Sequence, residues 1–411
     1  MWWRRSKSRI RNIKSIPMEE SKYEKRGVSP SKTDVRKAVS NLDKGIVSNS
    51  FCKIIPDVMG ENKKSLFGPS YCNVMHADGV GTKAVLAYLY WRETGDLSVW
   101  RGIAQDAAVM NVDDLLCVGA TTNMMVTSSI GRNKYRIPAE VLKAIVEGTQ
   151  EFCENMAAEH IDITFAGGET SDMGDIIRTI AVDATVSARM KRNEVISCER
   201  IQDGDVIIGL ASSGKATYED RYHSGIGSSG HTSARHDVLK HEYAEKYPET
   251  FDAQMPAELV YSGSKDLTDP SGVENLTVGQ LLLSPTRTYA PVVKAVLDNY
   301  RPSIHGIIHC TGGGQTKVMN FVNNLHVVKD HLFDTPVVFK MIQGESKTSW
   351  QEMFQVFNMG HRMELYVKES IASDIIKIAR YFNLDAKIIG HCENSSKKML
   401  TIESEYGTFT Y

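Results

Sequence analysis

Apolar positions along the chain switch between strand and helix spacing in a recurring order. Residues 73–75 predict a short strand before a glycine-rich turn, and residues 84–93 continue as an apolar helical run that ends before Gly95. Apolar residues near helical spacing return over 97–118 and stop at Gly119, a common helix terminator. The pattern predicts a strand, a glycine loop and two helices.

Strand and helix patterns then continue to alternate. Residues 121–130 are rich in valine, threonine and methionine and predict a strand, and Pro138 opens a helix over 139–160. Two further strands are expected at 161–165 and 177–190. Strands that alternate with helices indicate an α/β protein, here with mixed sheets.

A polar stretch, 191–205, separates this unit from a second one, and we place a domain boundary near Ile196. The chain has 411 residues, more than one hydrophobic core usually holds, so we expect two domains, 18–196 and 197–411. In the second unit the pattern predicts strands at 206–211 and 303–309 and helices at 233–247, 290–299 and 315–323.

Composition narrows the class of partner. Lys and Arg number 48 against 50 Asp and Glu, which leaves a formal charge of −2 and no global field for nucleic acid or an acidic membrane surface. The sequence has no apolar run long enough for a membrane helix, and its seven cysteines include no C-x-x-C pair. We expect a cytoplasmic protein with small-molecule partners. The basic residues 1–17 are interpreted as an unstructured extension before Met18.

Two glycine-rich motifs of the second unit are similar in sequence to known nucleotide-binding motifs. The segment from Gly209 to Ala216 follows a strand and nearly spells a P-loop, but Ala216 stands where a Ser or Thr hydroxyl must reach magnesium. The segment from Gly225 to Gly230 fits G-x-G-x-x-G, yet no strand precedes it and no acid follows at the usual distance. It is interpreted as a flexible loop or as a phosphate seat at the start of a helix.

A set of acids beside a glycine turn is the stronger signal. Asp78 opens a turn whose small residues let backbone amides approach a polyphosphate. Asp106, Asp113 and Asp114 share one face of a predicted helix, an arrangement that packing alone would not select. Glu169 follows two glycines at a strand end. Together these carboxylates favour a metal site over a solvated face or a simple turn.

In this order the motifs resemble the phosphoribosylformylglycinamidine cyclo-ligases, also called aminoimidazole ribonucleotide synthetases. The resemblance extends from about Tyr23 to the C-terminus. It implies an N-terminal domain whose strands build a barrel in a homodimer, and a C-terminal α/β domain that closes over the site. The matching segments are 23–28, 78–83, 106–120, 167–170, 212–214, 285–287, 305–314 and Phe357, Asn358 and Gly360.

The reaction that this resemblance implies is the ATP-dependent closure of an imidazole ring. The formyl oxygen of formylglycinamidine ribonucleotide takes a phosphoryl group from ATP, a nitrogen attacks the activated carbon, and phosphate leaves. The products are ADP and aminoimidazole ribonucleotide, an intermediate of purine biosynthesis. Phosphoryl transfer needs mainly positioning and cations, so the implied cofactors are ATP and Mg²⁺.

The resemblance also implies roles for individual residues. Metal ligands are expected at Asp78, Asp106, Asp113, Asp114 and Glu169. ATP contacts are expected at Asp78, Gly79, Gly81, Thr82, Lys83, Asp106 and Gly168. Catalytic roles are expected for Lys83, Asp114, His305 and His309, although either histidine is equally well a satisfied strand residue. Substrate contacts are expected at Ser212, Ser213, Arg287, Thr311, Gly312, Gly313, Gly314 and Asn358.

Departures from the family pattern keep alternatives open. Asp113 stands where the family more often has asparagine, and Thr122 replaces a proline. The loop after Gly214 carries an insertion, so the usual loop histidine has no clear match, with His223 and His231 as candidates. The alternatives are a non-catalytic nucleotide-binding paralogue, or a kinase or synthetase of the same fold that acts on selenide, thiamine phosphate or a hydrogenase maturation thiocarboxamide. If the protein is an enzyme, Asp78→Asn and Asp106→Asn are expected to lower turnover and leave the fold intact.

Overall fold

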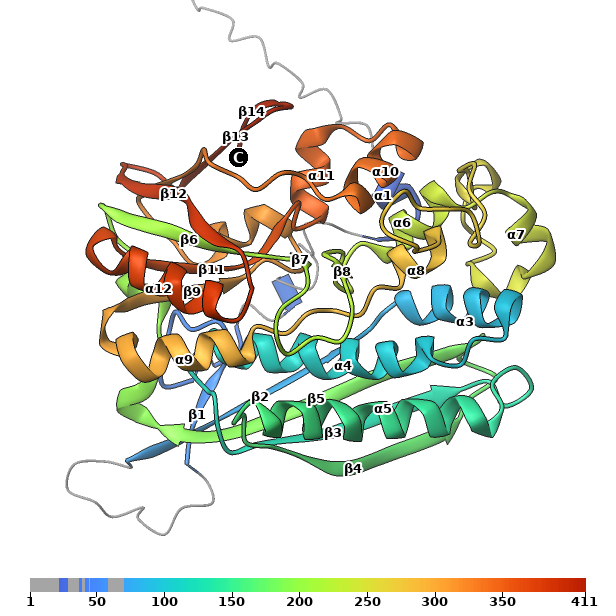
Figure 1. Ribbon diagram of the computed structural model, residues 1–411, viewed down its shortest axis with the longest axis horizontal. Helices are drawn as coiled ribbons and strands as arrows, with labels where there is room; N and C mark the ends of the chain where they lie inside the picture. The colour runs from blue at the N-terminus through green and yellow to red at the C-terminus, as the bar shows by residue number, and fades with distance from the viewer. Residues whose placement is uncertain (1–21, 29–36, 39–40, 44, 58–69) are drawn as a thin grey trace, which may run out of the picture.

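The computed structural model describes residues 22–28, 37–38, 41–43, 45–57 and 70–411 (Figure 1). The expected extension 1–17 and its boundary at Met18 lie outside these residues. The described chain is a mixed α/β structure built on two large sheets, as predicted. None of its described helices combines the length and apolar character that crossing a bilayer requires.

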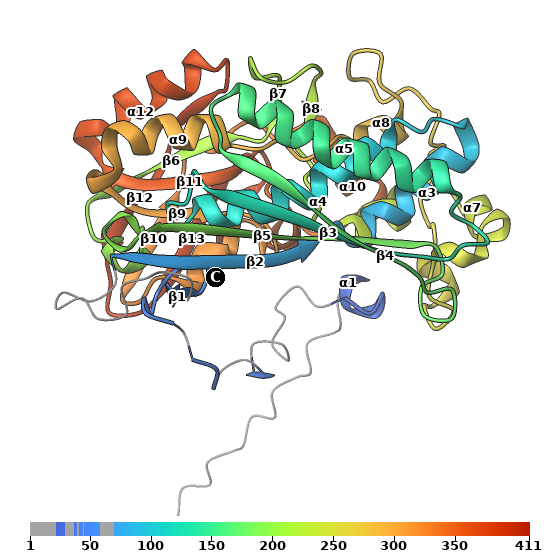
Figure 2. The same ribbon diagram turned by 90° about the horizontal axis from the view of Figure 1, so that it is seen from below.

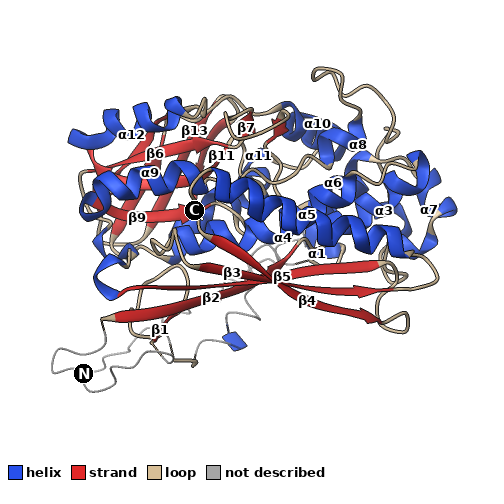
Figure 3. Ribbon diagram, turned by 60° about the horizontal axis from the view of Figure 1, so that its bottom comes forward, coloured by secondary structure: helices blue, strands red, loops and turns tan. Residues whose placement is uncertain are grey.

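The first sheet has the strand order β1-β2-β5-β3-β4, and only β3 and β4 run parallel. Buried and exposed residues alternate along β5, so one face of the sheet belongs to the core. Helices α4 and α5 lie on that side (Figure 3), and the long strands cross the width of the molecule (Figure 2). The elements are β1 (Ile54–Pro56), β2 (Tyr71–Gly79), α3 (Lys83–Thr94), α4 (Val99–Leu116), β3 (Met124–Arg132), α5 (Ala139–Ala158), β4 (Ile163–Asp172) and β5 (Ile180–Lys191).

The second sheet has the order β14-β13-β10-β12-β6-β11-β9, with β10 and β13 as its parallel pair. Helix α12 packs on β6, β11 and β12 and also against α9. The elements are β6 (Asp205–Ala211), α9 (Ala290–Tyr300), β9 (Ile304–His309), β10 (Leu325–Lys329), α10 (Val337–Ser346), α11 (Trp350–Val356), β11 (His361–Lys368), α12 (Glu369–Tyr381), β12 (Ala386–Asn394), β13 (Met399–Ser404) and β14 (Gly407–Thr410).

Helix α4 connects the two halves of the molecule. It packs against α3, α5, β2 and β5 on one side and against α9 and β9 of the second half on the other. Nearly all of its residues from Trp100 to Leu116 are buried, including the three aspartates. A helix that is buried all round needs its polar groups paired, so the acid face of α4 must find partners inside the protein.

Two predicted helices differ from the observed elements. The helix expected at 233–247 is interrupted, because Leu239 is extended and forms a bridge with Lys265, which leaves α6 (His231–Val238) and α7 (Glu242–Lys246). The helix expected at 315–323 is a 3₁₀-helix, Gly314–Asn320, entered through two glycines with positive φ. The remaining predicted strands and helices are present with shifted ends.

Candidate functional site

Three glycine loops that are far apart in the sequence meet at one pocket of about 280 Å³. The first contributes Gly81 and Thr82, the second residues 228–232, and the third Gly312 and Gly313. The first two loops are joined by a hydrogen bond of 2.8 Å between the hydroxyls of Thr82 and Thr232. Because α6 begins at His231 within the second loop, the N-terminal end of this helix lines the pocket, and a helix N-terminus suits a phosphate group.

Two glycines, one at the end of β2 before the first loop and one in the second loop, have close neighbours as well as a place near the pocket. A Cβ on Gly79 would lie 1.6 Å from the carboxylate of Asp183 on the neighbouring strand β5. Gly230 has a φ of +84°, and a Cβ there would lie 2.3 Å from the ring of Phe357. The glycine of the Asp78 motif therefore makes room for a neighbouring acid, and not only for a nucleotide.

Lys83 and Asp106 form an ion pair with no exposed surface, joined by 2.8 Å from Nζ to Oδ1. Nζ also donates to the carbonyls of Gly227 and Ser284, and the same Oδ1 accepts from the backbone amide of Thr286 at 2.6 Å. Burial lowers the pKa of Lys83, and the charge of Asp106 opposes this effect. The pair ties the first half of the chain to two loops of the second half.

Asp114 lies between two histidines. Its Oδ1 is 2.6 Å from Nδ1 of His309 on β9, and its Oδ2 is 3.2 Å from Nε2 of His76 on β2. Burial alone raises the pKa of Asp114, but the hydrogen bond from His309 and the charge of His76 outweigh burial and lower it. The carboxylate is thus ionised and compensated within the protein.

The protonation of His76 follows from its hydrogen bonds. Asn111 Nδ2 faces three carbonyl oxygens, those of Asp78, Ala107 and Ala184, so its Oδ1 is the atom that faces His76 Nδ1 at 2.9 Å. That ring nitrogen must donate. The other ring nitrogen faces the ionised Asp114 and must donate as well, so the geometry corresponds to a charged imidazolium.

Asp113 is also fully buried, and its partners come from the second half of the chain. Its Oδ1 accepts from the hydroxyl of Thr288 at 2.7 Å and from the amide of Tyr289 at 3.2 Å. Its Oδ2 is 3.5 Å from Nη2 of Arg362. Burial raises the pKa of Asp113, while the charge of Arg362 and the hydrogen bonds from Thr288 and Tyr289 act in the opposite direction.

The five predicted metal ligands do not form one cluster. Asp106, Asp113 and Asp114 are buried and each has its own partners, whereas Asp78 and Glu169 are exposed. In strand register, Glu169 lies opposite Ser129, and Ser129 lies opposite Asp183. Burial and the neighbouring charge of Asp78 raise the pKa of Asp183. The charges of Asp78 and Asp183 therefore act on each other, and neither acid forms an ion pair with another residue of the described chain.

Arg287, predicted to bind a ribose phosphate, is engaged inside the protein. It is 1% exposed and makes a two-pronged ion pair with Glu219, at 2.7 and 2.6 Å. Its Nη1 donates to the carbonyls of Ala211 and Ser213. The guanidinium thus has almost no donor left in this arrangement, and its contact with a ribose phosphate stays a prediction.

The Glu219–Arg287 pair leads to a pH prediction. Burial alone raises the pKa of Glu219, but the hydrogen bonds and charge of Arg287 lower it below the ordinary value of 4.5. A depressed carboxyl pKa contributes stability above the unfolded-state pKa that is lost as the pH falls through the folded-state pKa. In urea titrations at about pH 7 and about pH 4, the wild type is expected to lose more stability than the Glu219→Gln/Arg287→Met variant. Equal losses would contradict this assignment.

The predicted substrate residues at Ser212 and Asn358 bind each other. Ser212 Oγ donates to Asn358 Oδ1 at 2.8 Å, and Asn358 Nδ2 donates to the carbonyl of Gly225 at 2.7 Å. Both side chains are buried, so they hold the loop 225–230 in place. Ser213 pairs with Ser224 in a two-stranded ladder of β7 (Ser213–Gly214) and β8 (His223–Ser224), so the element that follows β7 is a strand where a P-loop would have a helix. The segment from Gly209 to Ala216 is thus no P-loop, as expected.

Three of the predicted histidines lie apart from Asp114. His305, at the start of β9, is 2.8 Å from Asp205, and so it is not grouped with His309 at the strand's other end. His223 faces the carbonyl of Pro285. His231 lines the pocket, where burial lowers its pKa to about 3 and the carbonyl of Leu282 is 2.9 Å from Nε2. Thr311 and Gly314 shape the third loop, in which the Gly314 amide donates to the Thr311 carbonyl.

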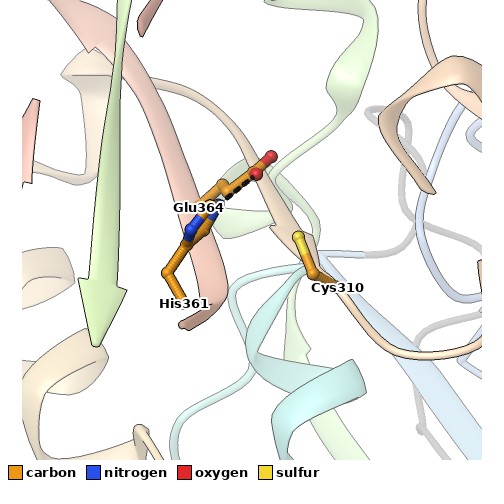
Figure 4. Close-up of side chains that lie close together, drawn as sticks. All are labelled: Cys310, His361 and Glu364. Carbon is orange, nitrogen blue, oxygen red and sulfur yellow. Dashed lines mark hydrogen bonds and ion pairs between the residues drawn. The ribbon is translucent and has the colours of Figure 1, made fainter. Parts of the chain in front are cut away.

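One cluster of metal-ligand types among the described residues lies elsewhere, at Cys310, His361 and Glu364 (Figure 4). Lys329 Nζ is 2.5 Å from Glu364 Oε1, so an ammonium group already supplies the positive charge. Burial alone would raise the pKa of Glu364, but Lys329 and His361 lower it to about 2. This cluster is a buried ion-pair network.

Sequence reasoning missed His76, Asn111, Asp183 and Arg362. His76 is two residues before Asp78, on the same face of an alternating strand, and this spacing is a usable signal. Asp183 lies in a strand with regular alternation, where an acid is ordinarily interpreted as a residue of the solvent-exposed face, so it gives no signal of a site. Arg362 has no local signal, because its partners are remote in the sequence.

Two protein-family models match the chain. AIR synthase related protein, N-terminal domain, matches residues 60–190, and AIR synthase related protein, C-terminal domain, matches residues 202–403. Phosphoribosylformylglycinamidine cyclo-ligase of Methanocaldococcus jannaschii is 29% identical over 333 residues, which is 80% of either chain. The protein of the same name from Alkaliphilus metalliredigens is 27% identical over 399 residues, covering 94% of this chain and 99% of its own.

Solved structures share the fold at low sequence identity. AaThiL complexed with AMPPCP and TMP is 10% identical, with a TM-score of 0.53, over 93% of this chain and 96% of that one. T. maritima PurL complexed with FGAR is 13% identical, with a TM-score of 0.51, over 93% of this chain and 49% of that one. The second match thus concerns about half of the larger protein.

Proposed function

This chain belongs to the AIR synthase related family, and we propose that it closes the imidazole ring of aminoimidazole ribonucleotide in purine biosynthesis. ATP activates the formyl oxygen of formylglycinamidine ribonucleotide, a nitrogen of the same molecule attacks, and ADP and phosphate are released. The observation that carries the proposal is the pocket where three glycine loops meet, because both substrates bear phosphate groups. The names of the relatives supply the reaction.

We propose that the predicted residues divide into two groups. Gly81, Thr82, Gly312 and Gly313 contact phosphate through the loops that line the pocket. Buried pairs, among them Lys83 with Asp106, fix the loops and the helix that form its walls. Positioning of this kind contributes a large part of catalysis in phosphoryl transfer and ring closure, because it removes the entropy of bringing reacting groups together.

We propose that Mg²⁺ accompanies ATP and that Asp78 and Asp183 hold it. The donor set fits a hard cation, because both are exposed carboxylates, and burial and the charge of Asp78 raise the pKa of Asp183. Glu169 is on the same sheet face as Asp183 and is retained as a third ligand candidate. Asp106, Asp113 and Asp114 do not fit, since their charges are already compensated. When bound, the ion neutralises charge on the transferred phosphoryl group.

The proposal is tested by supplying Mg-ATP and formylglycinamidine ribonucleotide to the purified protein. Stoichiometric formation of ADP and aminoimidazole ribonucleotide is expected. ADP that forms only with another acceptor, such as thiamine phosphate, would favour a kinase of the same fold. ATP binding without turnover of any acceptor would favour a non-catalytic paralogue.

We propose a homodimer formed through the open face of the first sheet. Met75 and Met125 both lie opposite Ser187, on the face that α4 and α5 do not cover, and they are 60% and 56% exposed. A row of exposed apolar side chains on a sheet face is typical of a protein interface. The resemblance to families with a dimer barrel supports the same surface.

The variant Met75→Lys/Met125→Lys is expected to be monomeric, because two buried ammonium groups would face their symmetry mates. Light scattering coupled to size exclusion measures the mass. Tyr381→Lys, an equally drastic change at an 82% exposed residue of α12, is the matched control and is expected to leave the dimer intact. A monomeric wild type, or a dimeric double variant, would contradict the assignment.

We propose the domain division near Ile196 and a cytoplasmic location. All strands of the first sheet precede residue 192 and all strands of the second follow residue 204, which supports the boundary. The seven cysteines are free and buried, which supports a reducing compartment. Small-molecule substrates, and neither nucleic acid nor membrane, are the partners that we propose.

A further inference from the structure

Arg362 lies where the two halves of the molecule meet. It is the second residue of β11 and is 2% exposed. Its guanidinium contacts Asp113 on α4 and His309 on β9, and Nη2 donates to the carbonyl of Arg287. The ring of Tyr289 lies under the guanidinium, 5.2 Å from its central carbon. The side chain is therefore held from several sides in one position.

The backbone that carries Arg362 is held by the buried network beside it (Figure 4). His361 Nε2 is 2.9 Å from Glu364 Oε1, and Lys329 Nζ is 2.5 Å from the same oxygen. Gln315 Nε2 donates to the carbonyl of His361 at 3.0 Å. Because His361 and Glu364, on either side of Arg362 in β11, are anchored, the strand holds the guanidinium against His309.

We propose that Arg362 is a positioning residue that holds His309 as a neutral imidazole protonated at Nδ1. Arginine is a donor only, and its Nε lies 3.1 Å from Nε2 of His309, so Nε2 must present its lone pair. The ring's single proton is then on Nδ1, which donates to Asp114 at 2.6 Å. The arginine thereby fixes the orientation of both the histidine and the carboxylate.

Arg362 also provides the counter-charge of Asp113. Among the residues that the structure describes, none donates a hydrogen bond to the buried Oδ2 of Asp113, and Arg362 Nη2 at 3.5 Å is its nearest cation. His309 Nε2 is 4.0 Å away and carries no proton in this arrangement. An aspartate where the family more often has asparagine is thus matched by an arginine across the interface between the two halves of the chain.

The guanidinium reaches the loop that lines the pocket. Its Nη1 is buried and has no hydrogen-bond partner in the described part of the chain, and a Cβ on Gly227 would lie 3.5 Å from it. The carbonyl of Gly227 in turn accepts from Lys83. Movement of Arg362 is therefore expected to disturb the pocket loop and the His309–Asp114 pair together.

The first test reads the tautomer of His309 by ¹⁵N NMR of protein labelled at histidine, with the signal assigned by its loss in His309→Asn. The expected wild-type spectrum shows a protonated Nδ1 and an unprotonated Nε2. In Arg362→Met the signal shifts toward the other tautomer or the imidazolium, and in Arg362→Lys, which restores a donor, it moves back toward wild type. A wild-type ring protonated at Nε2 overturns the proposal, even when the variants do not fold.

The second test is kinetic and rests on the proposed function. Arg362→Met is expected to lower kcat by about 10- to 100-fold, the order of loss that a small misplacement causes, and to change KM less. Arg101→Met, which removes an exposed arginine paired with Glu147 and Glu151, is the matched control. An unchanged kcat in Arg362→Met overturns a positioning role. Since the NMR signal needs no substrate, it stands even when the chain has another activity.

The third test separates compensation of Asp113 from positioning of His309. Arg362→Met leaves a buried carboxylate without its counter-charge, so its Tm is expected to fall. Adding Asp113→Asn removes that charge, and the double variant is expected to melt above Arg362→Met. The tautomer signal in the double variant should stay displaced, because the arginine is still absent. A double variant that melts no higher overturns the compensation of Asp113.

Discussion

Asp106→Asn is expected to destabilise the protein by about 3–5 kcal/mol, the usual cost of removing one partner of a buried ion pair. The ammonium of Lys83 would remain at 0% exposure without a counter-charge. Because Lys83 also donates to Gly227 and Ser284, loops of the second half would loosen from the first half. Urea unfolding measures the change. The sequence-based expectation of an intact fold in this variant therefore does not agree with the buried pair.

The matched control for Asp106 removes both charges. Lys83→Met/Asp106→Leu replaces the pair by apolar groups of similar volume and is expected to recover much of the lost stability. Lys191→Met breaks a half-exposed pair with Glu194 and is expected to cost less than about 1 kcal/mol. If Asp106→Asn unfolds at the same urea concentration as the wild type, the pair does not hold the two halves together.

Asp78→Asn and Asp183→Asn are each expected to lower kcat by about 10²–10³-fold with little change in stability. Both acids are exposed, so no buried charge is left without a partner. The expected cause is weaker binding of the cation that accompanies ATP, because one carboxylate ligand is lost. The Mg²⁺ concentration for half-maximal rate is therefore expected to rise. Initial rates over a Mg²⁺ series at saturating ATP measure both effects.

Asp172→Asn is the matched control for these two variants. Asp172 is an exposed acid at the end of β4 of the same sheet, paired with Arg132 at 2.8 Å. Its replacement should change neither the rate nor the Mg²⁺ dependence. If Asp183→Asn behaves like Asp172→Asn, then Asp183 only makes contact with Gly79, and the proposed cation site is wrong.

The acid stripe of α4 shows how far pattern reading extends. The spacing of Asp106, Asp113 and Asp114 correctly indicates one helix face that carries three carboxylates. Their partners are Lys83, Arg362 and the two histidines, which come from four different elements. Nothing in the local spacing pairs them, so one shared cation was a reasonable interpretation of three like charges.

The motif that begins at Asp78 shows the same limit. Its glycines are visible in the sequence, but the reason for Gly79 is the carboxylate of Asp183, more than a hundred positions away in the chain. A strand register is set by hydrogen bonds between segments, and a single strand does not contain that information.

Local periodicity was sufficient to establish the element types, the α/β class and the motifs, because helix and strand spacing follow from the repeat of the backbone itself. Only the tertiary structure decided which charges compensate one another, which glycines line the pocket and which arginine is occupied. The physical reason is that charge and hydrogen-bond pairing act over a few ångströms in space, and residues such as Arg362 and Asp113 meet only once the two halves have packed.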